Sequence, residues 1–418
     1  MNKFVYFIII LSLFQSSNGL ANMLPNEHSF ALKIVSELKK SKKCAVVTYD
    51  KKIKEINCDG HKTYTTNIFK DYQNLPSKDQ NNFIVDLVPV LSGKLPTEEK
   101  CYKDAAPLLM PRVRERFHFE ALKIYLKANG ADKASAEIPY LLVNDHLAVG
   151  LTLNTKNAIT TISKQQLKDW KIDFNIALDR AIENLRSLSN DHPFTEAHSG
   201  VWVSSWKDSY DPSRLLLPEM IRALKVKGEP IAFLPNRDTL IIVGSEDSKG
   251  LKKAIELVYK GRKSHRAATC MPFILRGEKL EEFKASRDHP LYEDLGYLAK
   301  LSNQDQYEEQ RSILTPTLEN DSTMIAEYKI ITPQQGESFS LSVVLDGFMT
   351  YLPESDKVAL TKGDDPEQSE EEFSSRLISF EKFKEVCGHI LERTDHYPQR
   401  YLIKRFPNEN ELKSMGIK

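Results

Sequence analysis

The sequence predicts an α+β fold in which helices and antiparallel hairpins alternate along the chain. The first basis is residues 218–259, where a helix, two apolar strands and a second helix follow one another. The second is residues 26–72, which repeat the order helix, hairpin, helix with negligible sequence identity. Composition adds only that the chain is globular, because 41% hydrophobic and 28% charged residues in a chain of 418 are typical of a protein with a sizeable core.

The central unit begins at Pro218, since proline fits the first helical position, where no backbone N–H is needed. Apolar residues recur there at helical spacing, namely Leu217, Met220, Ile221 and Leu224. Residues 231–234 and 239–243 are apolar at nearly every position, which indicates two paired strands covered on both faces. Between them, Pro-Asn-Arg-Asp at 235–238 predicts a turn. Residues 245–248 then cap a second helix that runs to about Tyr259.

Two stretches of this unit, Ser213–Pro218 and Pro235–Ser245, closely resemble the YtpQ-like family of uncharacterised bacterial proteins. Further matching pieces are Leu108–Arg114, Ile138–Leu153 and Leu167–Arg186, and together they span roughly Asn22 to Gly277. The C-terminal third resembles an extension of some members through residues 343–347 and 351–353. The resemblance implies an α+β fold and supplies no catalytic residue.

The N-terminus has the features of a secretory signal peptide over residues 1–21. Lys3 precedes an apolar run from Phe4 to Phe14, and Gly19 and Ala21 occupy the −3 and −1 positions of a cleavage site. A membrane anchor is the alternative, but a span needs about 20 apolar residues and this run is shorter. We therefore expect export, to the periplasm or the medium, after cleavage near Ala21, and no transmembrane segment.

The expected organisation is a YtpQ-like α+β domain over residues 22–285 and a smaller α+β domain over residues 286–418. The first domain has a candidate internal split near residues 128–137, which are small and polar. Residues 277–289 are charged and indicate a linker between the domains. The strands expected within residues 324–360 are interpreted as one small antiparallel sheet.

Charge and motifs exclude several classes of function. Lysine and arginine balance aspartate and glutamate, which argues against a nucleic-acid partner and gives no attraction to anionic membranes. No phosphate-binding or dinucleotide-binding glycine motif is present, so no cofactor is expected.

Three arginines lie close together in the sequence, namely Arg112, Arg114 and Arg116. They form either a local basic patch or a solvated edge paired with Glu115 and Glu120, and we favour the solvated edge.

Five cysteines remain for an oxidising compartment, where pairing is common. Residues 44–50 and 53–58 predict a hairpin that places Cys44 opposite Cys58, close enough for a disulfide. The alternative is two small core thiols, and the spacing does not decide between them.

The candidate binding residues are Arg214, Asn236, Arg237 and Asp238, which are the polar residues of the stretches that carry the resemblance. An arginine beside a turn can hold a carboxylate or phosphate with two hydrogen bonds. The alternative, which we favour, is that these side chains serve their own backbone and a structural network. His192 and His198 would need a third ligand to hold a metal, so a surface loop is the simpler interpretation.

Two hypotheses of function follow. We favour an exported, non-catalytic protein that binds a protein or small-molecule partner, because the sequence has no catalytic motif and no cofactor motif. The alternative is a periplasmic hydrolase whose acid and base groups converge only in the folded chain. No catalytic residue and no metal ligand is assigned from the sequence.

Overall fold

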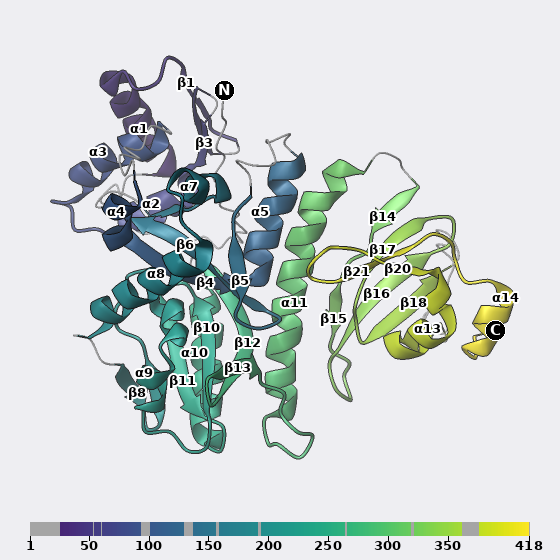
Figure 1. Ribbon diagram of the computed structural model, residues 1–418. Coiled ribbons are helices and arrows are strands. Elements are labelled where there is room, and N and C mark those ends of the chain that lie inside the picture. Colours follow the sequence, from purple (N-terminus) through teal and green to yellow (C-terminus); the bar gives the residue numbers. More distant parts are fainter. Residues whose placement is uncertain are drawn as a thin grey trace, which may run out of the picture. The chain divides into compact units, whose positions relative to one another are not determined.

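The computed structural model describes residues 26–52, 54–59, 61–92, 101–128, 137–155, 159–190, 194–263, 266–318, 322–361 and 376–417. Its helices alternate with strands that form several antiparallel and mixed sheets, which confirms the α+β expectation (Figure 1). The expected signal peptide, most of the expected split near 128–137 and His192 lie outside the described residues.

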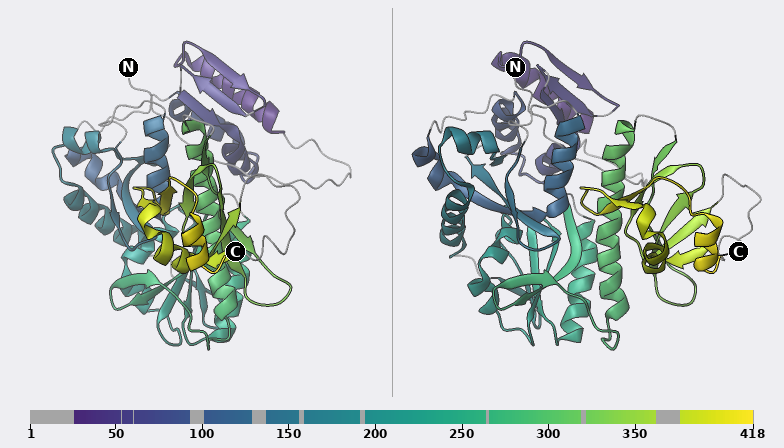
Figure 2. Two further views of the ribbon diagram at one scale, coloured as in Figure 1. Left: turned by 90° about the vertical axis from the view of Figure 1, so that its right-hand side faces the viewer. Right: turned by 45° about the vertical axis from the view of Figure 1, so that its right-hand side comes forward.

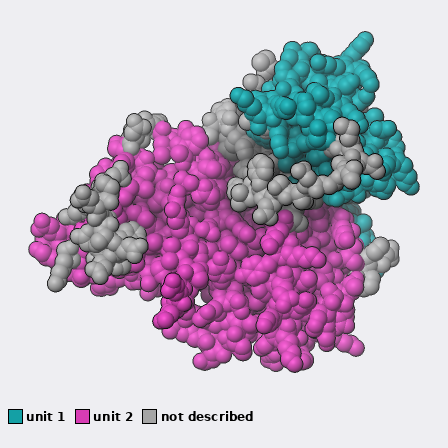
Figure 3. Space-filling view, turned by 180° about the vertical axis from the view of Figure 1, so that it is seen from behind, with its two compact units in different colours: residues 1–112, 129–139, 150–190 teal, residues 113–128, 140–149, 191–418 magenta. Residues whose placement is uncertain are grey.

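The chain divides into two compact units (Figure 3). Unit 1 takes its residues from 1–112, 129–139 and 150–190, and unit 2 from 113–128, 140–149 and 191–418. This division by contacts does not follow the chain boundary expected near residue 285, and that boundary stays a prediction.

The N-terminal part of unit 1 has the expected order of helix, hairpin and helix, with one additional strand. Its elements are α1 Glu27–Ser41, β1 Val47–Asp50, β2 Glu55–Cys58, β3 His61–Tyr64, α2 Thr65–Gln73 and α3 Gln80–Leu91. The side-chain oxygen of Asn26 accepts the N–H of Ser29 and so begins α1. Phe30, Ile34 and Leu38 on one face of α1 are fully buried against the strands and the next two helices.

Of the two interpretations left open for Cys44 and Cys58, the structure has the disulfide, but the predicted register of the hairpin is wrong. Val47, not Cys44, lies opposite Cys58, because the turn after Asp50 is longer than expected. The carboxylate of Asp59 accepts the N–H groups of Ala45 and Val46 at 2.9 and 2.7 Å. These bonds hold the segment before β1 against the end of β2, and the two cysteine Cα atoms lie 5.5 Å apart.

The next sheet is organised around a central strand, β6, which pairs with β4, β5 and β7. The elements of this region are α4 Tyr102–Ala105, η1 Ala106–Leu108, β4 Leu109–Glu115, α5 Arg116–Ala128, β5 Tyr140–Leu142, β6 Leu147–Asn154, β7 Ile159–Thr161, α7 Lys164–Asp169 and α8 Phe174–Ser189. The expected solvated edge is wrong for Arg114, which is only 7% exposed, whereas the expected pairing with Glu120 is present for Arg116 at 3.5 Å.

Unit 2 contains a six-stranded sheet with the order β13-β12-β10-β11-β9-β8. Its elements are β8 Thr195–His198, β9 Val201–Val203, η2 Asp211–Leu216, α9 Pro218–Arg222, β10 Pro230–Asn236, β11 Thr239–Gly244, α10 Ser248–Arg262, β12 Ala267–Arg276 and β13 Lys279–Glu282. The predicted central hairpin is confirmed, since Ile231 lies opposite Val243 in an antiparallel pair. Both strands are buried on both faces, and α10 packs against them.

Two expectations for the C-terminal third are wrong. The expected linker contains β13, which pairs with β12 and extends the six-stranded sheet. The expected single antiparallel sheet is instead two four-stranded sheets, β14-β17-β21-β20 and β15-β16-β18-β19, in which β14/β17 and β16/β18 are parallel pairs. Their strands are β14 Thr323–Ile325, β15 Lys329–Ile331, β16 Phe339–Leu345, β17 Met349–Pro353, β18 Lys357–Thr361, β19 Leu377–Ser379, β20 Leu391–Arg393 and β21 Arg400–Ile403. Short helices complete this part, namely η3 Thr315–Thr317, α13 Phe380–Cys387, η4 Gly388–Ile390 and α14 Glu409–Ser414.

The long helix α11, Tyr292–Leu314, joins the six-stranded sheet to the C-terminal sheets within unit 2. It packs against β12 on one side and β15 on the other (Figures 1 and 2). Ser302 of α11 accepts the N–H of Cys270 at 2.7 Å, and Tyr307 donates its hydroxyl to the carbonyl of Gln399 at 2.8 Å. Within the described part of the chain, none of the helices combines the length and the apolar composition that crossing a membrane requires.

Candidate functional site

Arg214, the first sequence-predicted binding residue, lies in the protein interior. Its guanidinium is fully buried in η2 and donates to both carboxylate oxygens of Asp208, at 3.0 and 2.8 Å. The same group stacks 3.8 Å from the ring centre of Trp206. These contacts give Arg214 a structural role, and its role in ligand binding stays a prediction.

The other three predicted residues form the turn between β10 and β11. The Asn236 side chain accepts the N–H of Asp238 at 2.9 Å and donates to the carbonyl of Gly261 at 3.3 Å. The N–H of Arg237 donates to the carbonyl of Arg266 at 3.3 Å. The Asn236 side chain therefore binds local backbone, as the favoured structural interpretation expects. The buried Nε of Arg237 has no hydrogen-bond partner among the described residues, and a binding role for these three residues stays a prediction.

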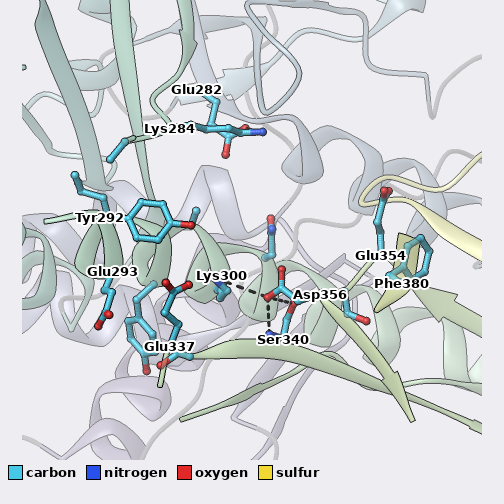
Figure 4. Close-up of a pocket in the computed structure, with 18 of the residues that line it drawn as sticks. Glu282, Lys284, Tyr292, Glu293, Lys300, Glu337, Ser340, Glu354, Asp356 and Phe380 are labelled. Carbon is cyan, nitrogen blue, oxygen red and sulfur yellow. Dashed lines mark hydrogen bonds and ion pairs between the residues drawn. The ribbon is translucent and has the colours of Figure 1, made fainter. Parts of the chain in front are cut away.

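A groove of about 850 Å³ lies within unit 2, between α11 and the sheet that contains β16 (Figure 4). One wall is formed by the end of β13 and the first half of α11, from Tyr292 to Asn303. The opposite wall is formed by the segment before β16, the turn between β17 and β18, and the start of α13. This volume falls within the range of roughly 300–1,000 Å³ that is usual for ligand sites.

The groove carries a negative charge. Its lining includes the six carboxylates of Glu282, Glu293, Glu337, Glu354, Asp356 and Glu381, but only two ammonium groups, Lys284 and Lys300. Both lysines already have a carboxylate partner, since Lys284 lies 3.1 Å from Glu282 and Lys300 lies 3.9 Å from Asp356. Among the described residues, the four remaining glutamates have no ion-pair partner.

Asp356 is the most firmly held of these carboxylates. Its Oδ2 accepts the N–H of Ser340 at 2.7 Å and the Ser340 hydroxyl at 2.9 Å, and its own N–H donates back to that hydroxyl oxygen at 2.7 Å. Figure 4 shows Lys300 reaching the same carboxylate from α11. The two walls of the groove are thus connected by an ion pair at this point.

The groove lining also contains five aromatic rings, namely those of Phe283, Tyr292, Tyr297, Tyr328 and Phe380. Tyr328 stacks on Tyr307 with ring centres 5.0 Å apart, and burial raises the pKa of Tyr328 to about 12. Its phenol therefore stays neutral at physiological pH. Aromatic faces next to carboxylates attract organic cations, because the ring quadrupole and the carboxylate charge act together.

At one end of the groove, Glu282 belongs to a hydrogen-bonded chain of three side chains. Its Oε2 lies 3.4 Å from Nε2 of His146, and Nδ1 of His146 lies 3.0 Å from the Tyr397 hydroxyl. The guanidinium of Arg116 lies 4.4 Å from the centre of the Tyr397 ring. The chain joins the turn before β6, the strand β13 and the loop before β21.

The environment shifts two pKa values in this chain in opposite directions. Burial raises the pKa of Glu282, but the hydrogen bond and charge of His146, together with Lys284, outweigh it and leave that pKa below its usual value. Burial raises the pKa of the Tyr397 phenol, and the nearby Arg116 charge only partly opposes this shift. Glu282 is therefore ionised and Tyr397 is protonated at neutral pH.

Within the described ranges, no group of three or more His, Cys, Asp or Glu side chains is arranged to hold a metal ion. Sequence reasoning missed the groove because its lining comes from separate segments between residues 282 and 381, which meet only through the parallel strand pairs. Comparison of the chain with protein-family models, curated proteins and solved structures finds no match. The function is therefore inferred from the groove and its residues.

Proposed function

We propose that this protein is an exported, non-catalytic binding protein whose acidic groove holds a ligand with several positive charges on an extended chain. The observation that carries the proposal is a set of four glutamates without an ion-pair partner among the described residues, Glu293, Glu337, Glu354 and Glu381, in a lining that also contains aromatic rings. A cation placed among them would gain both carboxylate attraction and contact with the rings.

The distribution of these glutamates favours a ligand with more than one cationic centre. Glu293 belongs to the first turn of α11, Glu337 precedes β16, Glu354 follows β17, and Glu381 lies in the first turn of α13. Figure 4 shows Glu293 and Glu354 on opposite sides of Lys300. Ammonium or guanidinium groups spaced along one flexible chain match this arrangement, whether the chain is a polyamine or a lysine- and arginine-rich peptide.

The alternative of a hydrolase receives less support from the same region. An acid, a histidine and a hydroxyl in series are the arrangement that activates a nucleophile. Here the hydroxyl in series with His146 and Glu282 is the phenol of Tyr397. Because burial raises the pKa of the phenol, Tyr397 is a poor nucleophile, and binding without chemistry is the better conclusion.

The proposal also includes export of the protein and a relationship to the YtpQ-like family. The apolar N-terminal run and the Cys44–Cys58 disulfide support an oxidising destination such as the periplasm. The antiparallel pair β10/β11 and the helices around it support a relationship to the YtpQ-like family.

The experiment is calorimetric titration of the protein with two probes, spermine and an N-terminally acetylated lysine hexapeptide. We expect at least one probe to bind with micromolar affinity at low salt and to weaken as salt is added, because screening reduces charge attraction. The variant E293Q/E337Q/E354Q/E381Q should lose at least tenfold in affinity. The matched control E229Q/E246Q/E278Q/E409Q neutralises four exposed glutamates outside the groove lining and should bind as the wild type does. Equal loss in both variants, or no binding of either probe, contradicts the proposal.

A further inference from the structure

We propose that His146 is a positioning residue of the groove, which holds Glu282 in place and makes ligand binding weaker at mildly acidic pH. The inference rests on the proposed function for its effect on binding. The link between His146 and Glu282 stands on geometry alone, because the two side chains lie 3.4 Å apart and are each about one-quarter exposed or less.

At neutral pH the contacts of His146 fix its tautomer. The Glu282 carboxylate accepts a hydrogen bond, so Nε2 carries the proton, and Nδ1 then accepts from the Tyr397 hydroxyl at 3.0 Å. The backbone also holds this residue, since the N–H of Arg116 donates to the His146 carbonyl at 2.7 Å. Glu282 is thereby held at one end of the groove, next to the imidazole ring.

Protonation of His146 changes both contacts. The imidazolium has two N–H donors, so the Tyr397 oxygen must accept and its own hydrogen must turn elsewhere. A full positive charge is added beside Glu282, whose carboxylate already has Lys284 at 3.1 Å. The end of the groove then repels a cationic ligand more strongly than it does at neutral pH.

The other charged groups around this chain do not cancel that effect. Arg116 of α5 lies over the Tyr397 ring and adds a second positive charge, although Glu120 lies 3.5 Å from Arg116 and offsets it. Glu115 at the end of β4 and Asp145 in the turn before β6 raise the pKa of the Tyr397 phenol, and burial raises the pKa of Glu115 itself. Of the side-chain types in this cluster, only histidine ordinarily changes charge between about pH 5 and 8.

A second histidine near the groove provides a matched control. The His289 ring packs edge-on against Phe283 of the groove lining, and its Nδ1 accepts the N–H of Leu291 at 3.1 Å. Among the described residues, its ring contacts Phe283 and Leu291, and no ion pair joins it to a lining carboxylate. A pH effect that arises from His289 is therefore separable from one that arises from His146.

The first test uses the free protein and NMR titration of the histidine rings and glutamate carboxyl carbons. The Glu282 carboxyl signal should shift with the same midpoint as the His146 ring. Glu282→Gln should lower that midpoint, because the imidazolium loses its nearest carboxylate and still faces Lys284 and Arg116. Glu281→Gln, on the same strand and 3.8 Å from Arg276, should leave it unchanged. An unmoved or raised midpoint in Glu282→Gln overturns the link.

The second test measures affinity for the acetylated lysine hexapeptide at pH 5.5 and 7.5. The wild type and His289→Gln should bind about three- to tenfold more weakly at pH 5.5, and His146→Gln should bind with nearly equal affinity at both. Retention of the full pH effect in His146→Gln overturns the regulatory proposal. Absence of binding by every variant at both pH values overturns the proposed function and this regulation with it, while the NMR result decides separately whether His146 holds Glu282.

Discussion

Arg214 and Asp208 form a two-pronged ion pair inside unit 2, with nitrogen to oxygen distances of 3.0 and 2.8 Å. The pair is covered by the Trp206 ring, and neither Arg214 nor Asp208 belongs to the groove lining. A buried guanidinium stays in place only while its partner remains ionised and aligned. The stretch Ser213–Pro218 therefore has a physical role in the fold that is separate from ligand binding.

Asp208→Asn should destabilise the protein by about 2–4 kcal/mol in urea denaturation, because it leaves the Arg214 charge buried without its carboxylate. The exposed pair of Arg222 and Glu278, 3.6 Å apart, supplies the control. Glu278→Gln should change the free energy of unfolding by less than about 0.5 kcal/mol. Affinity for the lysine hexapeptide should be unchanged in Asp208→Asn at temperatures where it is folded, and a selective loss would instead implicate this stretch in binding.

Removal of the Cys44–Cys58 disulfide should loosen the N-terminal part of unit 1. The bond closes a loop with a sequence separation of 14, for which chain-entropy estimates give about 3 kcal/mol. The double variant Cys44→Ser/Cys58→Ser should lower the unfolding temperature of the oxidised protein, and reducing agent should have no further effect on it. Cys101→Ser, which removes an exposed free cysteine, should behave as the wild type. A reductant-insensitive wild type would contradict the stabilising role.

Stability in acid should depend on Glu411. Its carboxylate accepts two hydrogen bonds from Arg405 at 2.8 and 2.7 Å and one from the Asn408 N–H at 2.7 Å, and these contacts lower its pKa to about 2. Because the folded pKa lies below the unfolded one, the stabilisation is complete above about pH 4.5 and is lost as the pH falls towards 2.

Glu411→Gln should therefore cost on the order of 1–2 kcal/mol at pH 7, less than the full shift implies because Arg405 is substantially exposed and solvent screens the pair. The difference between wild type and variant should shrink steadily below pH 4.5. Chemical denaturation at several pH values measures it, with Glu409→Gln in the same helix as the control. A difference that stays constant down to pH 2 would show that the contribution is not electrostatic.

Hydrogen bonds from Arg400 connect α11 to the C-terminal sheets. Arg400 is fully buried and donates to Gln310 and to the carbonyls of Ala326, Tyr351 and Tyr307. Arg400→Met should cost roughly 3 kcal/mol, because several buried acceptors lose their donor at about 1 kcal/mol or more each. Since α11 forms one wall of the groove, hexapeptide affinity should fall along with stability. A variant as stable as the wild type would contradict the proposed role of Arg400 in holding α11 against the C-terminal sheets.

The parts of the fold that could be predicted from the sequence are those encoded locally. Residues 231–243 predict a hairpin because two apolar runs flank a turn that contains proline, asparagine and aspartate. The structure has that hairpin. Helices that begin at Asn26, Asp173 and Ser379 were likewise predictable, because each cap residue accepts a hydrogen bond from the first turn.

The parts that could not be predicted depend on contacts between distant residues. The parallel pairing of β16 with β18 has no local signature, so the C-terminal strands were assigned to one antiparallel sheet. Charge alone suggested that Arg114 is solvated, whereas the strand that carries it is buried. The groove could not be predicted for the same reason. Glu293 and Glu381 are far apart in the sequence and line one groove only in the folded chain.

The most direct test of the central claim is a backbone and side-chain NMR map of the protein as acetylated lysine hexapeptide is added. Binding in the groove predicts that the largest chemical-shift changes occur at Tyr292, Tyr297, Tyr328 and Phe380, and that they disappear in E293Q/E337Q/E354Q/E381Q. Changes concentrated at the turn of Asn236, Arg237 and Asp238, or none above those caused by a neutral glycine–serine peptide, would contradict it.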